Sequence, residues 1–200
     1  MQTITMARWV FVIGAGLFLG ACASGPVELP ADYASPSFNA DTVDRVYLLP
    51  IVDHRIDKTK ALKLDEWLTK RAENALTERG YPAVLVEDRA TVEHISRDDL
   101  ETPAADWVGS LEPASARWIM LLVLEDSIAK TTFGSTGSAE MSGYLFDRND
   151  KTLAWRNKET GQFGQGGLIG MAMKGVMERS AIERAASNVF QGLPVRGKTP

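Results

Sequence analysis

Three short apolar runs in the sequence have the length and composition of buried β-strands. They cover residues 45–53, 81–88 and 117–126, and each is rich in valine, leucine, isoleucine or aromatic residues. The third run, RWIMLLVLED, is the most apolar, so we expect it at the centre of a sheet. Pro50 has no amide N–H for a ladder and predicts that the first strand ends there or lies at an edge.

Between the first two runs, the spacing of apolar residues changes to that of an α-helix. One apolar stripe within residues 58–80 consists of Leu64, Trp67, Leu68, Ala72, Ala75 and Leu76. Gly80 is a favourable residue just beyond a helix, and Pro82 cannot continue one. A helix that joins two strands predicts that they run parallel, with a right-handed crossover.

The second half of the chain predicts a hairpin and a final helix. Residues 138–159 have the pattern of two strands, with a turn at residues 147–150. The preceding stretch, KTTFGSTGS at residues 130–138, has the composition of a flexible loop. Residues 161–194 predict a glycine-rich start and then a helix that bends around Ser180. The inner face of that helix would consist of Ala172, Val176, Ile182, Ala185 and Val189.

These elements follow one another in the order β-α-β-α-β-β-β-α, with short helical pieces in the polar segment 89–116. The sequence contains no internal repeat and no second hydrophobic core. A chain of 200 residues suits one ordinary domain. We therefore predict a single α/β domain, α+β-like in its mixed sheet, with the helices packed on that sheet.

The N-terminus has the pattern of an export signal. Arg8 precedes the apolar run 9–19, which is too short for an ordinary membrane-spanning helix of about 20 residues. The sequence LGAC at residues 19–22 resembles the lipobox of bacterial lipoproteins, in which the cysteine is acylated and the preceding peptide is removed. The resemblance implies a signal peptide over residues 1–21 and lipid attachment, palmitate included, at Cys22. The alternative is an ordinary signal peptide with a chance cysteine near its end.

The segment that follows predicts a tether. Residues 22–41 contain three prolines and many small polar residues, so we expect a lipidated N-terminus and a flexible linker. The globular domain would then cover residues 42–194, followed by a loose tail at 195–200. Ala23 stands where an aspartate would resemble an inner-membrane retention signal. The resemblance therefore implies the periplasmic face of the outer membrane.

Residues 43–194 resemble a family of Gram-negative lipoproteins. The resemblance rests on YLLPIVD, ERGYPAVLVE, ARWIMLLVLED, GYLFDRNDKTLAW and the final helix that begins with glycines and small residues. The domain of that family is similar to the amino-terminal domain of TolB and to the curli-secretion lipoprotein. This implies an accessory role in the cell envelope and transfers no catalytic motif. The turn departs from the family pattern, because Asn149 and Asp150 replace its usual glycine-containing turn.

Composition argues against several classes of function. The formal net charge is −4, with no basic run of the kind that nucleic-acid binding requires, so we predict no nucleic-acid partner. A single cysteine can form neither an internal disulfide nor a cysteine-based zinc site. The fold must therefore depend on packing.

The sequence GQGGLIG at residues 164–170 resembles a phosphate-binding loop only superficially. Its glycine spacing is not that of the dinucleotide fingerprint, and too few residues follow for the rest of such a fold, so we predict no cofactor. The glycines Gly166, Gly170 and Gly175 would instead let the helix approach the sheet closely.

Apolar side chains occur on more than one side of the start of this helix, namely Leu168, Ile169, Met171 and Met173. Such a turn must be covered by its own domain, by a partner or by lipid. We expect either burial within the domain or contact with an envelope protein, and Lys174 argues against deep insertion into lipid.

Two histidines, His54 and His94, each follow a carboxylate residue, and such a pair can bind a metal or act as a base. Neither HExxH nor Gly-x-Ser-x-Gly accompanies them. We therefore predict loop histidines, no catalytic residue and no metal.

Three functions follow from these observations. The first is a non-enzymatic, membrane-anchored accessory that binds or assembles part of a transport, secretion or cell-wall complex. The second is an envelope hydrolase that uses His54 or His94. The third is a self-assembling, pore-associated subunit, which would be a homo-oligomer. We favour the first.

Overall fold

The computed structural model describes residues 29–56, 58, 62–111 and 113–197. Cys22 and the predicted signal peptide lie outside this part of the chain. None of the helices within it is both long and apolar enough to cross a membrane.

The described residues form one seven-stranded sheet with the order β1-β7-β6-β5-β2-β4, and β3 pairs with β5 beside this path. The strands are β1 (Tyr33–Ala34), β2 (Val46–Leu48), β3 (Val52–Asp53), β4 (Ala83–Leu85), β5 (Trp118–Thr132), β6 (Gly134–Asp147) and β7 (Thr152–Gly166). β2 runs parallel to both β4 and β5, whereas β5, β6 and β7 are antiparallel neighbours. The predicted mixed sheet is therefore confirmed.

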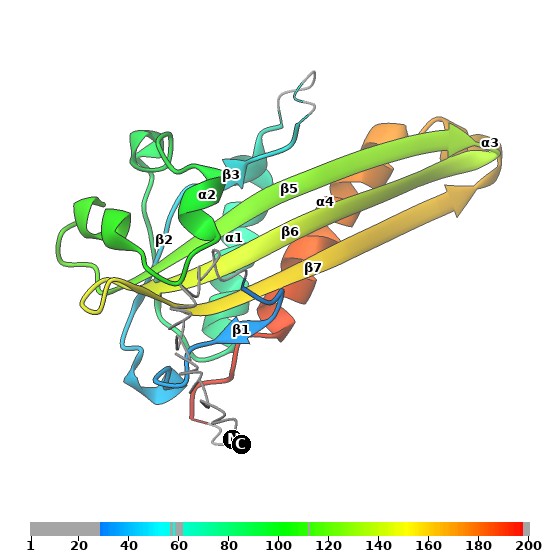
Figure 1. Ribbon diagram of the computed structural model, residues 1–200. Coiled ribbons are helices and arrows are strands. Elements are labelled where there is room, and N and C mark those ends of the chain that lie inside the picture. Colours follow the sequence, from blue (N-terminus) through cyan, green and yellow to red (C-terminus); the bar gives the residue numbers. More distant parts are fainter. Residues whose placement is uncertain (1–28, 57, 59–61, 112, 198–200) are drawn as a thin grey trace, which may run out of the picture.

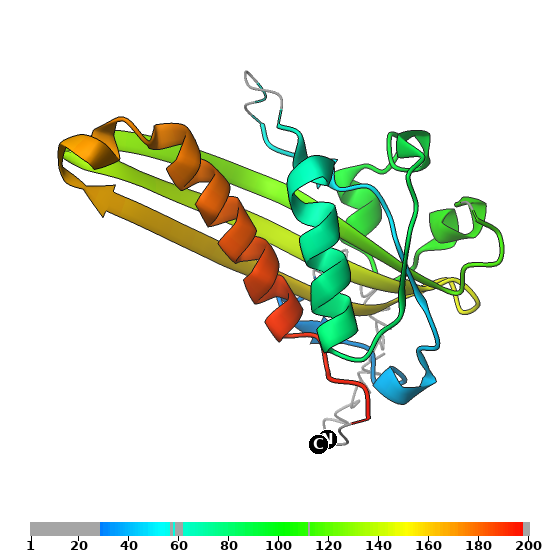
Figure 2. The ribbon, with the colours of Figure 1, turned by 180° about the vertical axis from the view of Figure 1, so that it is seen from behind.

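Helices cover both faces of this sheet. The helices are α1 (Leu64–Glu78), α2 (Arg97–Leu100), α3 (Gly167–Met171) and α4 (Lys174–Gln191), with 3₁₀ turns at Ala40–Thr42, Arg89–Thr91 and Asp106–Ser110. Figure 2 shows α1 and α4 side by side on one face, and Figure 1 shows α2 on the other, with the turns Arg89–Thr91 and Asp106–Ser110 beside it. Together they cover both faces of β5 from Trp118 to Leu124, which explains its continuous apolar run.

The predicted strand–helix–strand unit is confirmed by the parallel pairing of β2 and β4. In α1, the predicted stripe is buried at Leu64, Leu68, Ala72 and Leu76. The first apolar run is divided into β2 and β3, and Pro50 lies in the break, in agreement with its lack of an amide donor. Between them, the Asp65 carboxylate accepts a hydrogen bond from the amide of Ile51 at 2.8 Å.

The segment 130–138, for which we predicted a flexible loop, instead forms the ends of two strands. After a register shift between Leu124 and Asp126, β5 and β6 pair continuously from Asp126 opposite Glu140 to Thr132 opposite Gly134, and β6 pairs with β7 to Gly166. A three-stranded distal ribbon, defined here as residues 125–140 and 157–166, therefore projects from the wider part of the sheet (Figures 1 and 2).

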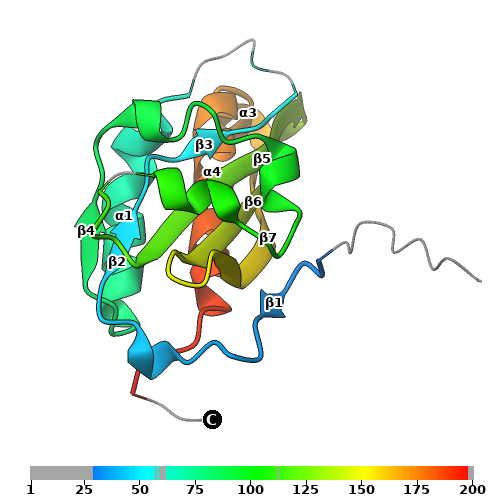
Figure 3. The ribbon, with the colours of Figure 1, turned by 60° about the vertical axis from the view of Figure 1, so that its left-hand side comes forward.

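Residues 29–41, which we expected to belong to the tether, lie against the domain. Leu29 is buried, and its carbonyl accepts a hydrogen bond from Arg156 at 3.2 Å. β1 adds to the edge of β7, opposite Trp155 and Arg156, as Figure 3 also shows. A linker over the whole of 22–41 is thus wrong for its described part, because one apolar residue and a two-residue strand hold it on the sheet.

The final helix differs from the prediction in where it breaks. α4 is continuous through Ser180, and the break lies at residues 172–173, between α3 and α4. Val176 is exposed, and the buried face consists of Met177, Ala181, Ile182, Ala185, Ala186, Val189 and Phe190. This face of α4 packs against the sheet along the length of the helix, so no bend is needed to bring the apolar residues into the core.

Candidate interaction surface at the end of the ribbon

Exposed apolar side chains gather at the far end of the distal ribbon. We call Phe133, Leu168, Met171 and Val176 the tip surface; their exposed fractions are 81, 80, 42 and 50%. Phe133 forms the turn between β5 and β6, and the other three belong to α3 and the first turn of α4. An exposed cluster of large apolar residues is typical of a contact site.

The charge of this end of the molecule differs from that of the whole chain. Residues 127–139 and 160–177 contain Lys130 and Lys174 but no aspartate or glutamate, although the full sequence has 26 acidic residues. The tip surface is therefore apolar with a weakly basic surround. Such a surface suits a partner that offers apolar groups without a strong positive charge.

Close backbone packing holds the tip surface in place. Gly134 has φ +123°, and a Cβ there would lie 2.7 Å from the Gly166 Cα, so the turn after Phe133 requires glycine. At Gly170, a Cβ would overlap the Gln165 carbonyl, which means that α3 lies directly on the end of β7. The predicted close packing is thus confirmed at Gly170. It is wrong at Gly166, where a Cβ would meet no described atom within 4 Å.

The predicted contact residues have different surroundings. Leu168 and Met171 are exposed, and Met173 is half-buried. Ile169 lies in α3, and its side chain is not among those that the structure describes. Burial within the domain is therefore wrong for Leu168 and Met171. Contact with a partner stays a prediction for them.

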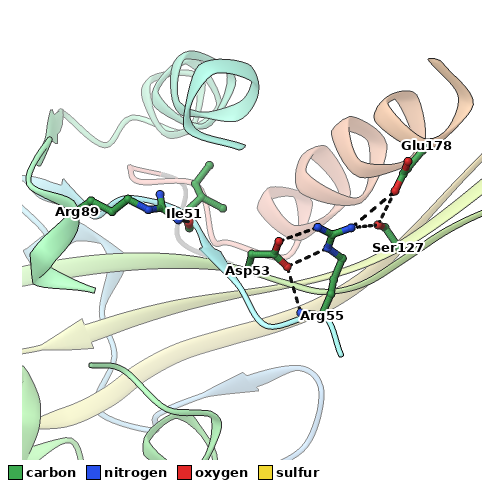
Figure 4. A network of polar contacts seen from close by, with 6 residues as sticks. All are labelled: Ile51, Asp53, Arg55, Arg89, Ser127 and Glu178. Carbon is green, nitrogen blue, oxygen red and sulfur yellow. Dashed lines mark hydrogen bonds and ion pairs between the residues drawn. The ribbon is translucent and has the colours of Figure 1, made fainter. Parts of the chain in front are cut away.

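A buried polar network lies where the distal ribbon leaves the body of the domain (Figure 4). Arg55, just beyond β3, is only 5% exposed. Its guanidinium donates to both carboxylate oxygens of Asp53, at 2.9 and 2.8 Å, and to the Ser127 hydroxyl at 3.4 Å. Ser127 in turn donates to Glu178 of α4 at 3.0 Å, and Glu178 lies 3.9 Å from the guanidinium.

This network joins β3, β5 and α4 by charge as well as by packing. Burial alone would raise the pKa of the Asp53 carboxyl, but hydrogen bonds and charge from Arg55 outweigh burial and hold this pKa below its ordinary value. Asp53 is therefore ionised at neutral pH and balances the buried guanidinium. All its members have partners, so we assign the network a structural role: it fixes α4, and hence the tip surface, relative to the body.

The two histidines lie apart from the tip surface and line different pockets. His54 lines a pocket of about 480 Å³ together with Asp53 and Arg89, and its Nε2 lies 3.3 Å from the Ile95 carbonyl. His94 lines a pocket of about 320 Å³ beside Trp107. Within the described ranges, no group of three or more histidine, cysteine and acidic residues could hold a metal ion.

Sequence reasoning singled out Leu168 and Met171 but missed Phe133 and Arg55. Phe133 stands alone among small polar residues, so its segment reads as a loop. Its one signal is a large apolar residue directly before a glycine, at the centre of a Thr-Thr-Phe-Gly-Ser turn. A charged residue after a strand normally lies in solvent, so nothing local predicts the burial of Arg55.

No family model matches the sequence, and no curated protein matches it either. Several solved structures are similar to it. A leucine-to-methionine variant of PelC from Paraburkholderia phytofirmans, a dodecamer, has a TM-score of 0.50 at 16% identity, over 82% of this chain and 97% of that one. Lipoprotein GNA1162 from Neisseria meningitidis has a TM-score of 0.41 at 15% identity, over 70% and 99%. The LpoB C-terminal domain from Salmonella enterica has 0.36 at 16% identity, over 60% and 83%. At 16% identity, the similarity to the PelC variant shows the fold and no more.

Proposed function

We propose that this protein is a lipoprotein of the bacterial cell envelope that binds another envelope component through its tip surface. It is held by lipid on Cys22, at the periplasmic face of the outer membrane, and it acts without catalysis. The observation that carries the proposal is the concentration of exposed apolar residues at the end of the ribbon. The lipobox-like sequence supports the anchor.

The dimensions of the chain support a role for the tip away from the anchor. Leu29 is seven positions beyond Cys22, so the domain begins within about 25 Å of the attachment point. Gly166 lies ten residues beyond Arg156, where β1 pairs with β7, and ten strand residues span about 33 Å. A ribbon that points away from the bilayer would therefore present the tip surface well inside the periplasm.

Two further features belong to the proposal. The lack of catalysis is supported by the separate pockets of His54 and His94, which form no shared acid–base site. Self-association is supported by the PelC variant of similar fold, which is a dodecamer.

Site-specific photocrosslinking in cells tests the binding role. A photoreactive residue replaces Leu168 or Met171 of the full chain, and the matched control replaces Leu85, which is also exposed and apolar but lies on β4. We expect the tip positions alone to crosslink to one envelope protein, identified by mass spectrometry, and Phe133→Ser to abolish that product. The same product from Leu85, or no product from either tip position, would contradict the proposal.

The anchor is tested separately by Cys22→Ser in the full chain. We expect the unsubstituted chain to incorporate labelled palmitate and to sediment with outer-membrane vesicles. The Cys22→Ser variant should lose both properties. Sedimentation with the inner membrane would contradict the proposed location, and unchanged labelling of the variant would contradict the attachment site.

A further inference from the structure

The outer edge of β5 is open along the distal ribbon. β2 pairs with β5 from Trp118 to Met120, and β3 pairs only with Val123 and Leu124. Beyond Leu124, β5 continues to Thr132, and no other described strand lies against its outer edge (Figure 1). An open strand edge presents unpaired N–H and C=O groups, which form a template for another strand.

On the opposite edge of the ribbon, formed by β7, side chains of α4 already occupy backbone carbonyls. On β7, the Arg184 guanidinium donates to the Gln162 carbonyl at 3.1 Å, and the Asn188 amide donates to the Thr160 carbonyl at 2.9 Å. In the part of the chain that the structure describes, no side chain donates in this way to a carbonyl between Glu125 and Thr131. The two edges of one ribbon therefore differ in their capacity to bind a further strand.

The side chains along the open edge are complementary to themselves. Asp126, Ile128 and Lys130 alternate along β5, so they lie on one face of the sheet, and all three are exposed. Ile128 is 47% exposed despite its apolar side chain. Along the strand, these side chains are acidic, apolar and basic in turn. In an antiparallel copy the order is reversed, so each acidic side chain would lie opposite a basic one.

We propose that β5 pairs antiparallel with β5 of a second copy of this chain, about a two-fold axis at Ile128. Asp126 of each copy then lies opposite Lys130 of the other, and the two Ile128 side chains meet at the axis. Parallel pairing in register would instead place like charges opposite each other, which is unfavourable. The interface is isologous, since both copies contribute the same residues.

The surrounding structure is compatible with this register. The Leu124 carbonyl already accepts a hydrogen bond from the His54 amide at 2.9 Å, so the ladder ends with Glu125 opposite Thr131. In an antiparallel pair the wider parts of the two sheets lie at opposite ends, and each ribbon lies beside the other. This edge would be the surface through which the proposed self-association occurs, and the pairing requires neither the lipid anchor nor the tip contact.

Disulfide crosslinking tests the register. Full-length chains with Ile128→Cys are oxidised in membranes with copper phenanthroline, and mass spectrometry identifies the product by the linked peptides that carry the introduced thiol. Directly opposite residues of an antiparallel pair have Cα atoms about 4.5–5.5 Å apart, within the range of a disulfide. Gln162→Cys is the matched control, because it is exposed on the opposite edge of the ribbon. The unsubstituted chain, with Cys22 alone, gives the background.

We expect a covalent dimer from Ile128→Cys and background levels from Gln162→Cys. Equal dimer from both positions, or background from Ile128→Cys, would overturn the inference. Amine-reactive crosslinking of the unsubstituted chain distinguishes an error in this interface from an absence of self-association. Oligomers without the Ile128→Cys disulfide would refute this interface alone, and a chain that stays monomeric would refute self-association as well.

Charge reversal gives a second test that a folding defect cannot imitate. In the Ile128→Cys chain, Lys130→Asp or Asp126→Lys alone places like charges opposite each other twice. Each should lower the dimer yield about fivefold. The double variant, Asp126→Lys with Lys130→Asp, restores opposite charges and should restore the yield. Unchanged yields in the single variants, or no recovery in the double variant, would overturn the proposed pairing.

Discussion

Asp53 and Arg55, two residues apart at the end of β3, form a two-pronged ion pair with oxygen–nitrogen distances of 2.9 and 2.8 Å. The Arg55 amide also donates to the same carboxylate, at 3.1 Å. Because the pair is buried and continues through Ser127 to Glu178, it connects β3 to α4, the helix whose first turn contributes Val176 to the tip surface. Loss of one partner therefore affects folding and the position of the tip together.

The first prediction concerns Asp53→Asn. The substitution leaves the Arg55 guanidinium buried with a weaker acceptor, and we expect it to lower the free energy of unfolding by about 2–3 kcal/mol at pH 7. Because the folded-state pKa of Asp53 lies below its ordinary value of 3.8, its contribution is present above about pH 4 and is lost as pH falls through the folded-state pKa.

Urea unfolding at pH 7 and at pH 3 measures this effect. The difference between Asp53→Asn and the unsubstituted protein should be largest at pH 7 and should shrink at pH 3. Asp98→Asn, at an exposed carboxylate of α2, is the control and should change little at either pH. An equal loss at both pH values would contradict an electrostatic origin.

Much of the fold follows from local patterns. The change from strand to helical spacing identifies α1 and the parallel unit, because one stripe of that helix faces the sheet. The distal ribbon does not follow, since its strands are rich in glycine, serine and threonine and show no apolar alternation. Ladder hydrogen bonds and contact with α4 hold these strands. Both depend on segments far away in the sequence.

The candidate surface could be found only in part from the sequence. Leu168 and Met171 were identifiable because an all-round apolar turn needs a cover. Phe133 lies near them because it forms the turn between β5 and β6, and the composition of this segment does not predict that hairpin. The burial of Arg55 depends on Glu178, which the fold brings to it from α4. Long-range placement of this kind leaves no periodic signal in either segment.

A second prediction tests the close contact between α4 and the ribbon. A Cβ at Gly161 would overlap the Ala181 carbonyl and the Ala185 amide of α4, and backbone atoms cannot move aside cheaply. We expect Gly161→Ala to lower the free energy of unfolding by about 2–3 kcal/mol. Gly166→Ala, on the same strand, meets no described atom within 4 Å and should change it by less than about 0.5 kcal/mol. Equal effects in denaturant unfolding would show that α4 does not press on β7.

A third prediction separates stability from binding at the tip surface. Leu168 is exposed, so Leu168→Ser should leave the free energy of unfolding within about 0.5 kcal/mol of the original value. Ile182 is fully buried on the inner face of α4, and Ile182→Ala should lower the free energy of unfolding by about 2–4 kcal/mol. Thermal unfolding of the two variants provides the comparison. A large loss of stability in Leu168→Ser would mean that this side chain packs within its own domain.

The last prediction concerns Tyr81, which is buried at the end of α1 and connects it to the C-terminal segment. Its hydroxyl donates a hydrogen bond to the Pro194 carbonyl at 2.7 Å, and burial raises its pKa from 10.0 to about 12. The folded state thus favours the neutral phenol. The stability that this provides is complete below pH 10 and is lost as pH rises from 10 to about 12. Tyr81→Phe should lower the free energy of unfolding by about 1 kcal/mol at pH 7 through loss of the hydrogen bond, and should make stability fall less steeply above pH 10.

Some decline will remain, because burial also raises the pKa of Tyr144. Tyr47→Phe serves as the control for the hydrogen bond, since no described residue hydrogen-bonds to the Tyr47 hydroxyl, and it should change the free energy of unfolding at pH 7 by less than about 0.5 kcal/mol. Chemical unfolding at pH 7, 10 and 12 measures all three proteins, and an unchanged slope in Tyr81→Phe would show that this buried phenol does not govern the alkaline limit of the fold.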